Sequence, residues 1–220
     1  MFAVNMEPSY SLILLSGGKG NRFGSDQPKQ YLPFQGDPLI LNSLKIFLQI
    51  PKIKEVVVVC DAQYQTVFQN YSVKFAIPGD SRQDSVLSGV LEVSQPWVLV
   101  HDGARPFVYL DEVNDIMSAA IISGSATLAS PLTYTVKQCS PVKTIARDNL
   151  AIVHTPQCLR TEILLEGLCL AKDIGEILTD DTHAAEILGI PTTLVYNKHP
   201  QIKITYPQDL TIANALTWER

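Results

Sequence analysis

The chain has 220 residues, of which 46% are hydrophobic, and a formal net charge of −5. This length suits one domain over residues 1–220, and the apolar content allows a large core and excludes a disordered chain. The negative charge argues against a general nucleic-acid binder, so cations that bind a ligand must be gathered locally.

Four cysteines are scattered along the chain without a Cys-x-x-Cys pair. This usage predicts neither a zinc site nor a disulfide framework, and it favours a reducing cytoplasm. Residues 1–10 contain Glu7 and Pro8 and lack a long apolar run, which is typical of a loose tail and not of a signal peptide. No stretch is apolar over the length that a membrane span requires, so we expect no membrane contact.

The first predicted strand, 12–15, runs into a glycine-rich loop at residues 16–20. Glycines let a backbone approach a ligand closely and turn its amides toward an anion. Lys19, Arg22 and Lys29 add positive charge to the same region. Together these features predict a polyphosphate site, with an ordinary glycine turn as the alternative.

Two well-known phosphate loops do not match this sequence. The P-loop requires a lysine after its last glycine, whereas Lys19 precedes Gly20. The dinucleotide fingerprint requires a third glycine at the position of Phe23. The loop is therefore a phosphate loop of another type.

Strand and helix signals alternate through the rest of the chain, which predicts an α/β fold with a mostly parallel sheet and helices on both faces. The predicted helices are 37–49 with Asp37 as its cap, 63–71, a helix capped by 79–81 that runs to 93, 111–123, 161–172, 180–188 and 207–216. The predicted strands after the first are 55–60, 73–77, 97–100, 126–130, 193–196 and 202–204.

Residues 132–154 interrupt this alternation with two β-prone pieces, 133–137 and 143–145, separated by polar turns. They predict an arm that projects from the domain. A lone hairpin is marginally stable in water, so we expect the arm to pack against something, and a second copy of the chain is the candidate.

Three further segments lie near the carboxyl ends of predicted strands, where parallel sheets bind ligands. Residues 79–85 start a helix and favour a polar or anionic group, or they are a simple cap. Asp102 follows a buried strand and suits Mg²⁺, or it pairs with an arginine to close a loop. Lys203 lies between two isoleucines and alone indicates little. Asp180 and Asp181 favour helix capping over a metal site.

Seven motifs occur in order along the chain. They are Ser16-Gly-Gly-Lys-Gly-Asn-Arg22, Pro28-Lys-Gln-Tyr-Leu32, Gly79-Asp-x-Arg-x-Asp-Ser85, His101-Asp-Gly-Ala-Arg-Pro106, Thr155-Pro-Gln157, Leu178-Thr-Asp-Asp181 and Ile202-Lys-Ile-Thr205. From about Ser11 to Leu216 the chain resembles the 2-C-methyl-D-erythritol 4-phosphate cytidylyltransferases of the non-mevalonate isoprenoid pathway. The resemblance implies a three-layer, Rossmann-like nucleotidyltransferase fold.

The family reaction joins the phosphate of methylerythritol phosphate to the α-phosphorus of CTP, by in-line attack, and releases diphosphate. A phosphate nucleophile is already anionic, so positioning and fixed positive charge should supply most of the catalysis. The resemblance assigns Arg22 and Lys29 to the α-phosphate, Lys203 to both phosphates at the reaction centre, and Mg²⁺ as the cofactor.

The resemblance also implies the binding residues. For CTP they are Ser16, Gly17, Gly18, Lys19, Gly20, Gly79, Asp80, Ser85 and Asp102, of which Asp102 also meets Mg²⁺. For the sugar phosphate they are Arg105, Thr135, Arg147, Thr155, Thr179 and Lys203, although threonines are frequent in β-structure for propensity alone. The family arm swaps into a twofold partner, so a homodimer through residues 132–154 is implied, with Thr135 and Arg105 serving the neighbouring subunit.

Three other functions remain open at this point. A ribitol-5-phosphate cytidylyltransferase shares the cation loop and the Pro-Lys-Gln motif, although Ala104 favours the isoprenoid enzyme. A non-catalytic nucleotide sensor on the same fold is disfavoured by the joint presence of Arg22, Lys29 and Lys203. A dinucleotide-dependent redox enzyme is least supported, because the third glycine is absent.

Overall fold

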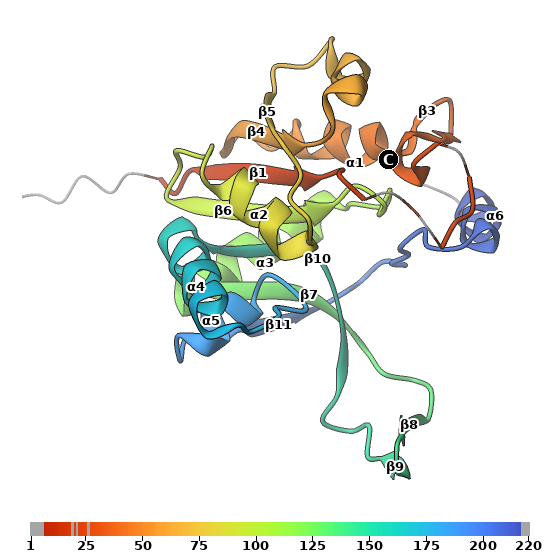
Figure 1. The fold of residues 1–220 in the computed structure, drawn as a ribbon, viewed down its shortest axis with the longest axis vertical. Helices are drawn as coiled ribbons and strands as arrows, with labels where there is room; N and C mark the ends of the chain where they lie inside the picture. The colour runs from red at the N-terminus through yellow and green to blue at the C-terminus, as the bar shows by residue number, and fades with distance from the viewer. Residues whose placement is uncertain (1–6, 19, 21, 26, 217–220) are drawn as a thin grey trace, which may run out of the picture.

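The computed structural model describes residues 7–216 except 19, 21 and 26. Its centre is a seven-stranded sheet in the order β11-β7-β10-β6-β1-β4-β5 (Figure 1). The strands are β1 (Tyr10–Leu15), β4 (Ile53–Val59), β5 (Lys74–Ala76), β6 (Trp97–Asp102), β7 (Ser125–Pro131), β10 (Ala151–Arg160) and β11 (Thr193–Tyr196). Only β10 runs antiparallel to its neighbours within this sheet, which confirms the predicted mostly parallel arrangement.

Helices cover both faces of the sheet, because successive side chains of a strand point to opposite sides. Leu12 and Leu14 of β1 pack with α1 and α3, whereas Ile13 packs with α2, α4 and α5. The helices are α1 (Leu39–Phe47), α2 (Arg82–Val90), α3 (Leu110–Ser123), α4 (Thr161–Ile174), α5 (His183–Ile187) and α6 (Pro207–Ala215), with 3₁₀ turns η1 (Lys29–Tyr31) and η2 (Ala62–Phe68). The three-layer α/β prediction is confirmed.

No helix in the described part of the chain is both long and apolar enough to cross a membrane.

The predicted start of the first long helix is wrong. Residues 37–38 form the short strand β3 (Asp37–Pro38), which pairs with β2 (Pro33–Phe34), and α1 begins at Leu39. Gln35 and Gly36 both have positive φ, 51° and 89°, and turn the chain tightly between these strands. Asp37 therefore does not cap α1, and its carboxylate instead accepts a hydrogen bond from Lys45 Nζ at 2.6 Å.

Two strand predictions also differ from the structure. Residues 202–204 form no strand, although Ile204 is fully buried and donates its N–H to the Ala104 carbonyl at 2.9 Å. Conversely, the long strand β10 covers the predicted end of the arm and a stretch after it for which we predicted neither strand nor helix. Its pairing with β7 is interrupted between Val153 and Gln157, where Pro156 cannot donate to the ladder.

The predicted helix over 63–71 is the 3₁₀ turn η2, and the helix predicted from residue 180 begins only at His183. Other predicted elements differ at their ends by a few residues, as expected for fraying termini.

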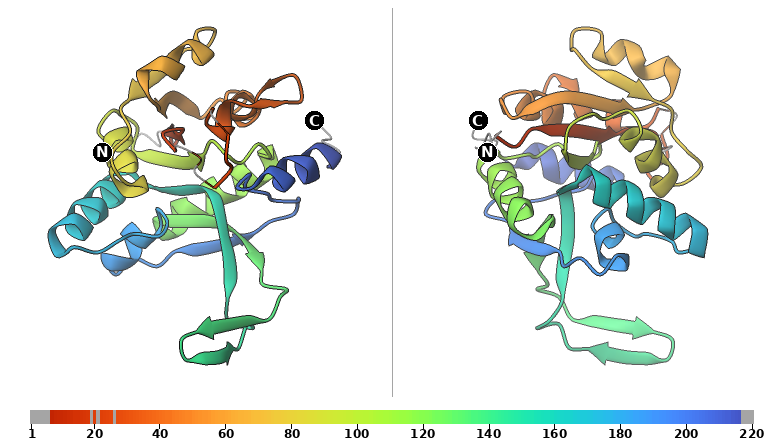
Figure 2. Two further views of the ribbon diagram at one scale, coloured as in Figure 1. Left: turned by 45° about the vertical axis from the view of Figure 1, so that its right-hand side comes forward. Right: turned by 90° about the vertical axis from the view of Figure 1, so that its left-hand side faces the viewer.

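Residues 132–154 project from the body of the molecule as the sequence predicted. They carry the hairpin of β8 (Val136–Cys139) and β9 (Val142–Ile145), held away from the sheet by extensions of β7 and β10 (Figures 1 and 2). Tyr134 and Val142 are 80% and 75% exposed on this arm. These apolar side chains lack the burial that would stabilise a free hairpin.

Candidate active site

A pocket of about 550 Å³ opens at the carboxyl ends of β1 and β6. Its walls come from the loop after β1, the turn η1, the start of α2 and the segment after β11. Residues predicted to bind CTP or to act in catalysis that line it are Gly17, Gly18, Gly20, Arg22, Lys29, Gly79, Asp80, Ser85, Asp102 and Lys203. Lys19 lies outside the described residues.

The pocket brings Lys203, from near the end of the chain, together with two cations from near its start. Arg22, Lys29 and Lys203 all line it. Burial, and then the positive charges of Lys203 and Arg22, lower the pKa of Lys29. The charges of Lys203 and Arg22 therefore add to the effect of burial on Lys29, and a bound polyanion would relieve their repulsion.

Gln30 holds the glycine loop in place. Its side-chain Nε2 donates to the carbonyls of Ser16 at 2.7 Å and of Gly18 at 2.9 Å, and Gln30 is 3% exposed. The Ser16 hydroxyl is buried beside the pocket and bonds to the Tyr31 hydroxyl. Because Gln30 engages both carbonyls, their negative ends are not free to repel an anion.

Gly17 has no room for a side chain, because a Cβ there would lie 2.4 Å from the Cβ of Pro78. Gly20 has a φ of 68°, a conformation that favours glycine. The loop backbone therefore depends on these two glycines for its approach to the pocket.

The start of α2 forms a second wall. Ser81 caps the helix, and Ser81 and Asp84 form a reciprocal capping box. The cap therefore lies within the predicted residues 79–81. The Ser85 hydroxyl accepts from Gly79 N–H at 3.1 Å and donates to the Ser81 carbonyl at 2.9 Å. The resulting turn places Asp80 and Gly79 at the pocket surface.

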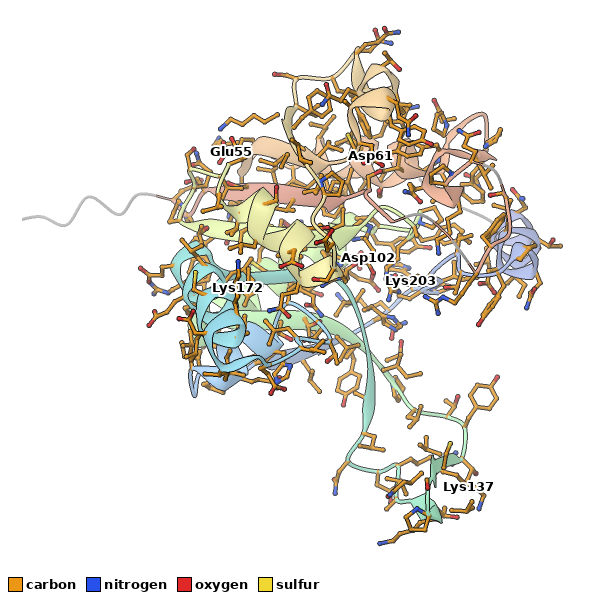
Figure 3. The ribbon with its side chains drawn as sticks, viewed as in Figure 1. Glu55, Asp61, Asp102, Lys137, Lys172 and Lys203 are labelled. Atoms are coloured by element: carbon orange, nitrogen blue, oxygen red, sulfur yellow. The ribbon has the colours of Figure 1, made fainter. Side chains whose placement is uncertain are left out.

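Asp102, at the end of β6, is the electrostatic centre of the site. Lys203 Nζ lies 2.8 Å from Oδ2, Arg105 Nε lies 3.3 Å from Oδ2, and Arg82 lies 3.3 Å from Oδ1. Burial would raise the pKa of Asp102, but these three positive charges hold it well below its usual range. Figure 3 shows Asp102 and Lys203 next to each other.

Asp181 explains the position of Arg82. The Arg82 guanidinium makes two hydrogen bonds of 2.7 Å to the Asp181 carboxylate and also reaches Asp102. Helix capping was predicted for both aspartates, but the cap of α5 is Thr182. Asp180 accepts the first N–H of that helix, from His183, at 2.9 Å, whereas Asp181 binds Arg82. Sequence reasoning missed Gln30 and Arg82 as site residues, although both lie inside motifs that it had singled out.

Asp102 fits a Mg²⁺ ion that arrives with a nucleotide. Among the residues that the structure describes, no three His, Cys, Asp or Glu side chains gather as a metal cluster. Mg²⁺ is commonly held by one or two carboxylates together with substrate phosphates, and Asp102 supplies one carboxylate at the pocket wall. Its oxygens already accept from cations, so the ion would replace one of those contacts.

Two predicted sugar-phosphate residues lie beneath the pocket. Arg105 is 8% exposed, and its Nη1 donates to His154 Nδ1 at 3.2 Å. The Thr155 hydroxyl is buried between the Asp102 N–H, at 3.0 Å, and His101 Nδ1, at 3.1 Å. Both residues support the end of β6 in the single chain, and neither lines the pocket.

Of the remaining predicted sugar-phosphate residues, Lys203 lines the pocket, whereas three others are exposed and do not line it. Thr179 lies in the loop before α5, and Thr135 and Arg147 lie on the arm. Arg147 donates to the Thr133 carbonyl. Lys137, which marks the arm in Figure 3, points away from Asp102 and Lys203. The arm residues could reach a pocket only on a second copy of the chain, so their role stays a prediction.

An open, mostly parallel sheet with a glycine-rich loop and a cationic pocket at its carboxyl edge defines a class of α/β protein that binds phosphorylated ligands there. The sequence model of the 2-C-methyl-D-erythritol 4-phosphate cytidylyltransferase family matches residues 10–219. The chain belongs to this family.

Named relatives and solved structures agree with this membership. The chain is 61% identical to the enzyme of this name from Chlamydia abortus, over 98% of this chain and 100% of that one. It is 64% identical to the one from Chlamydia pneumoniae, over 94% and 98%. The crystal structure of the cytidylyltransferase from Thermus thermophilus superposes with a TM-score of 0.79 at 31% identity, over 96% of this chain and 98% of that one. The crystal structure of the one from Francisella tularensis superposes with a TM-score of 0.81 at 30% identity, over 94% of this chain and 98% of that one.

Proposed function

We propose that this chain transfers a cytidylyl group from CTP to 2-C-methyl-D-erythritol 4-phosphate, giving 4-diphosphocytidyl-2-C-methyl-D-erythritol and diphosphate. The observation that carries the proposal is the convergence of Arg22, Lys29 and Lys203 on one pocket beside a glycine-rich loop, in a chain of this family.

The chemistry follows from the charges of the two substrates. A phosphate oxygen of the acceptor forms a bond to the α-phosphorus of CTP while the bond from that phosphorus to the bridging oxygen breaks. Diphosphate leaves with that electron pair, and no proton has to move. The main obstacle is repulsion between two anions, which the side chains of Arg22, Lys29 and Lys203 would offset most strongly in the transition state.

Each wall of the pocket suits one part of CTP. The loop that carries Gly17, Gly18 and Gly20 would hold the β- and γ-phosphates, with Ser16 fixing its start and Lys19 adding charge. The turn of residues 79–85 would hold the cytosine and ribose through Gly79, Asp80 and Ser85.

Asp102 would hold Mg²⁺ and meet the ribose end of the nucleotide. When bound, the ion neutralises charge on the phosphates. In the free protein Asp102 instead orients Lys203 at 2.8 Å.

The acceptor site would be completed by a homodimer through residues 132–154. In that arrangement Thr135 serves the neighbouring subunit, and Arg147 and Thr179 add contacts to the sugar phosphate. Arg105 and Thr155, which are buried beneath the pocket of their own chain, would contribute by holding the end of β6. The exposed apolar side chains of the arm support such an interface. We expect neither nucleic acid nor membrane as a partner, and the scattered cysteines favour the cytoplasm.

The test is diphosphate release with CTP and each of two acceptors. We expect turnover with methylerythritol phosphate in the presence of Mg²⁺ and none with ribitol 5-phosphate. Turnover only with ribitol 5-phosphate would replace the proposed acceptor. Binding of CTP without turnover on either acceptor would instead indicate a nucleotide sensor.

A further inference from the structure

Lys203 lies on a segment that the sheet does not hold. β11 ends at Tyr196 and α6 begins at Pro207, and the residues between them form neither strand nor helix. A lysine has a long, flexible side chain, so its ammonium can be placed at a reacting phosphate only if its backbone is fixed.

Glu112 fixes the first half of this segment. It lies in the first turn of α3 and is 2% exposed, outside the pocket. Its Oε1 accepts the backbone N–H groups of Lys198 at 2.7 Å and His199 at 2.9 Å, and its Oε2 accepts Gln201 Nε2 at 2.8 Å. The buried Glu112 carboxylate thus accepts three hydrogen bonds, and hydrogen bonds to an ionised group are stronger than those between neutral groups.

Asp209 fixes the other half. Its Oδ2 accepts the backbone N–H groups of Thr205 and Tyr206, both at 2.8 Å. Between the two carboxylates, the fully buried side chain of Ile204 anchors the chain in the core. The backbone of this segment is therefore held by the Glu112 carboxylate before Lys203 and by the Asp209 carboxylate after it, and this fixes Lys203 at the pocket.

We propose that Glu112 is a positioning residue for the transfer reaction and acts through Lys203 without touching either substrate. This inference rests on the proposed function, because it requires Lys203 to act in catalysis. Losing the three bonds would let residues 198–203 move, and a misplacement of about 1 Å at a reacting group can cost about a hundredfold in rate.

The chain offers a conservative variant and a matched control. In Glu112→Gln the amide oxygen still accepts from Lys198 and His199. Among the described residues, Gln201 Oε1 is buried without a hydrogen-bond partner, so Gln201 can turn its amide to accept from the new NH₂ group. Asp115 is the control. It lies on the same helix, but its contact with residues 197–206 is to the exposed side-chain ammonium of Lys198 and not to the backbone.

Glu112→Ala should lower kcat about tenfold with a smaller change in the KM for CTP, and Glu112→Gln should recover most of that loss. Asp115→Ala should keep the rate of the unaltered protein. Hydrogen exchange followed by mass spectrometry should show faster exchange over residues 197–204 in Glu112→Ala and unchanged exchange in Asp115→Ala. Unchanged exchange there in Glu112→Ala would overturn the inference without reference to activity.

The deciding experiment combines Glu112→Ala with Lys203→Ala. If Glu112 acts through Lys203, the double variant should be no slower than Lys203→Ala alone. The same tenfold loss in both backgrounds would overturn the inference while leaving the proposed function intact. Full activity of Lys203→Ala, or no transfer by the unaltered protein, would instead reject the proposed role of Lys203 or the proposed reaction.

Discussion

At the scale of single residues, the site is arranged around uncompensated positive charge. Asp102 and Asp181 balance part of the charge of Arg82, Arg105 and Lys203. Lys29 has a lowered pKa from burial and from its cationic neighbours. Each phosphate group that binds in this pocket is therefore stabilised electrostatically, because it reduces the repulsion between the cations of the free protein.

Replacing either Arg22 or Lys29 by alanine should lower kcat by about a hundredfold and change the KM for CTP less, because their charge acts mainly in the transition state. Steady-state diphosphate release measures both constants. Lys54→Ala, which removes an exposed lysine of β4, is the matched control and should leave both unchanged. A higher KM with an unaltered kcat would contradict the assignment.

Gln30→Leu should raise the Kd for CTP about tenfold, because the carbonyls of Ser16 and Gly18 lose the donor that holds the loop. Isothermal titration with CTP checks this. Gln27→Ala, which removes a more exposed amide that donates to the Tyr31 carbonyl at 3.2 Å, should have little effect. Equal losses of affinity in the two variants would show that Gln30 has no special part in the loop.

At the scale of elements, the arm and the body of the molecule differ in kind. The body buries the inner strands of its sheet between two layers of helices, whereas the hairpin β8–β9 has helices on neither face in this chain (Figure 2). Two strands alone are marginal in water. We therefore expect the arm to be buried in a dimer interface. Because Thr135 and Arg147 lie on the arm, loss of this interface should also affect the proposed acceptor site.

Tyr134→Asp combined with Val142→Asp should convert a dimer into a monomer, because two apolar side chains of the arm would become charged at the interface. Light scattering after size-exclusion chromatography measures the mass. Ile122→Asp changes an apolar residue of α3 that is 89% exposed, and it should leave the dimer intact. If the unaltered protein is already a monomer at working concentration, the shared acceptor site is excluded.

At the scale of the whole molecule, His154 links four segments that are distant in the sequence. Its Nδ1 accepts from Arg105, and its Nε2–H donates to Ser130 Oγ at 2.7 Å, which in turn donates to Asn197 Oδ1. Burial, and then the charge of Arg105, lower the pKa of His154 to about 4. The folded protein therefore keeps this imidazole neutral at a pH where the unfolded chain would protonate it.

This difference predicts a loss of stability in mild acid. The neutral His154 contributes fully to the stability of the fold above the pKa of a histidine in the unfolded chain, about 6.5. This contribution is lost as the pH falls toward the pKa of His154 in the folded protein. Between about pH 7 and pH 5 we expect the free energy of unfolding to fall by about 2 kcal/mol for this group. Urea unfolding followed by circular dichroism measures it, and His154→Asn, which keeps an acceptor for Arg105, should show a smaller fall. The same fall in both proteins would assign it to other groups.

The sequence by itself determined the alternation of strands and helices, the glycine-rich loop and the cations of the site, because periodicity and glycine spacing are local properties. It could not determine which acidic residue would pair with which base. Asp37, Asp180 and Asp181 all resemble helix caps in the sequence, yet Asp37 binds Lys45, Asp180 accepts the first N–H of α5 from outside the helix, and Asp181 holds Arg82.

Only the tertiary structure decided where Lys203 lies and why. A lysine between two isoleucines resembles a strand, but the backbone of this segment is held by carboxylates from α3 and α6. It likewise decided that β10 is an antiparallel strand inside the sheet, between β7 and β6, which Pro156 obscured in the sequence. Asp209 is a near neighbour in the sequence, but Glu112 and the β7 residues that pair with β10 lie tens of residues from their partners. A local pattern carries no information about such contacts, because only the packed fold creates them.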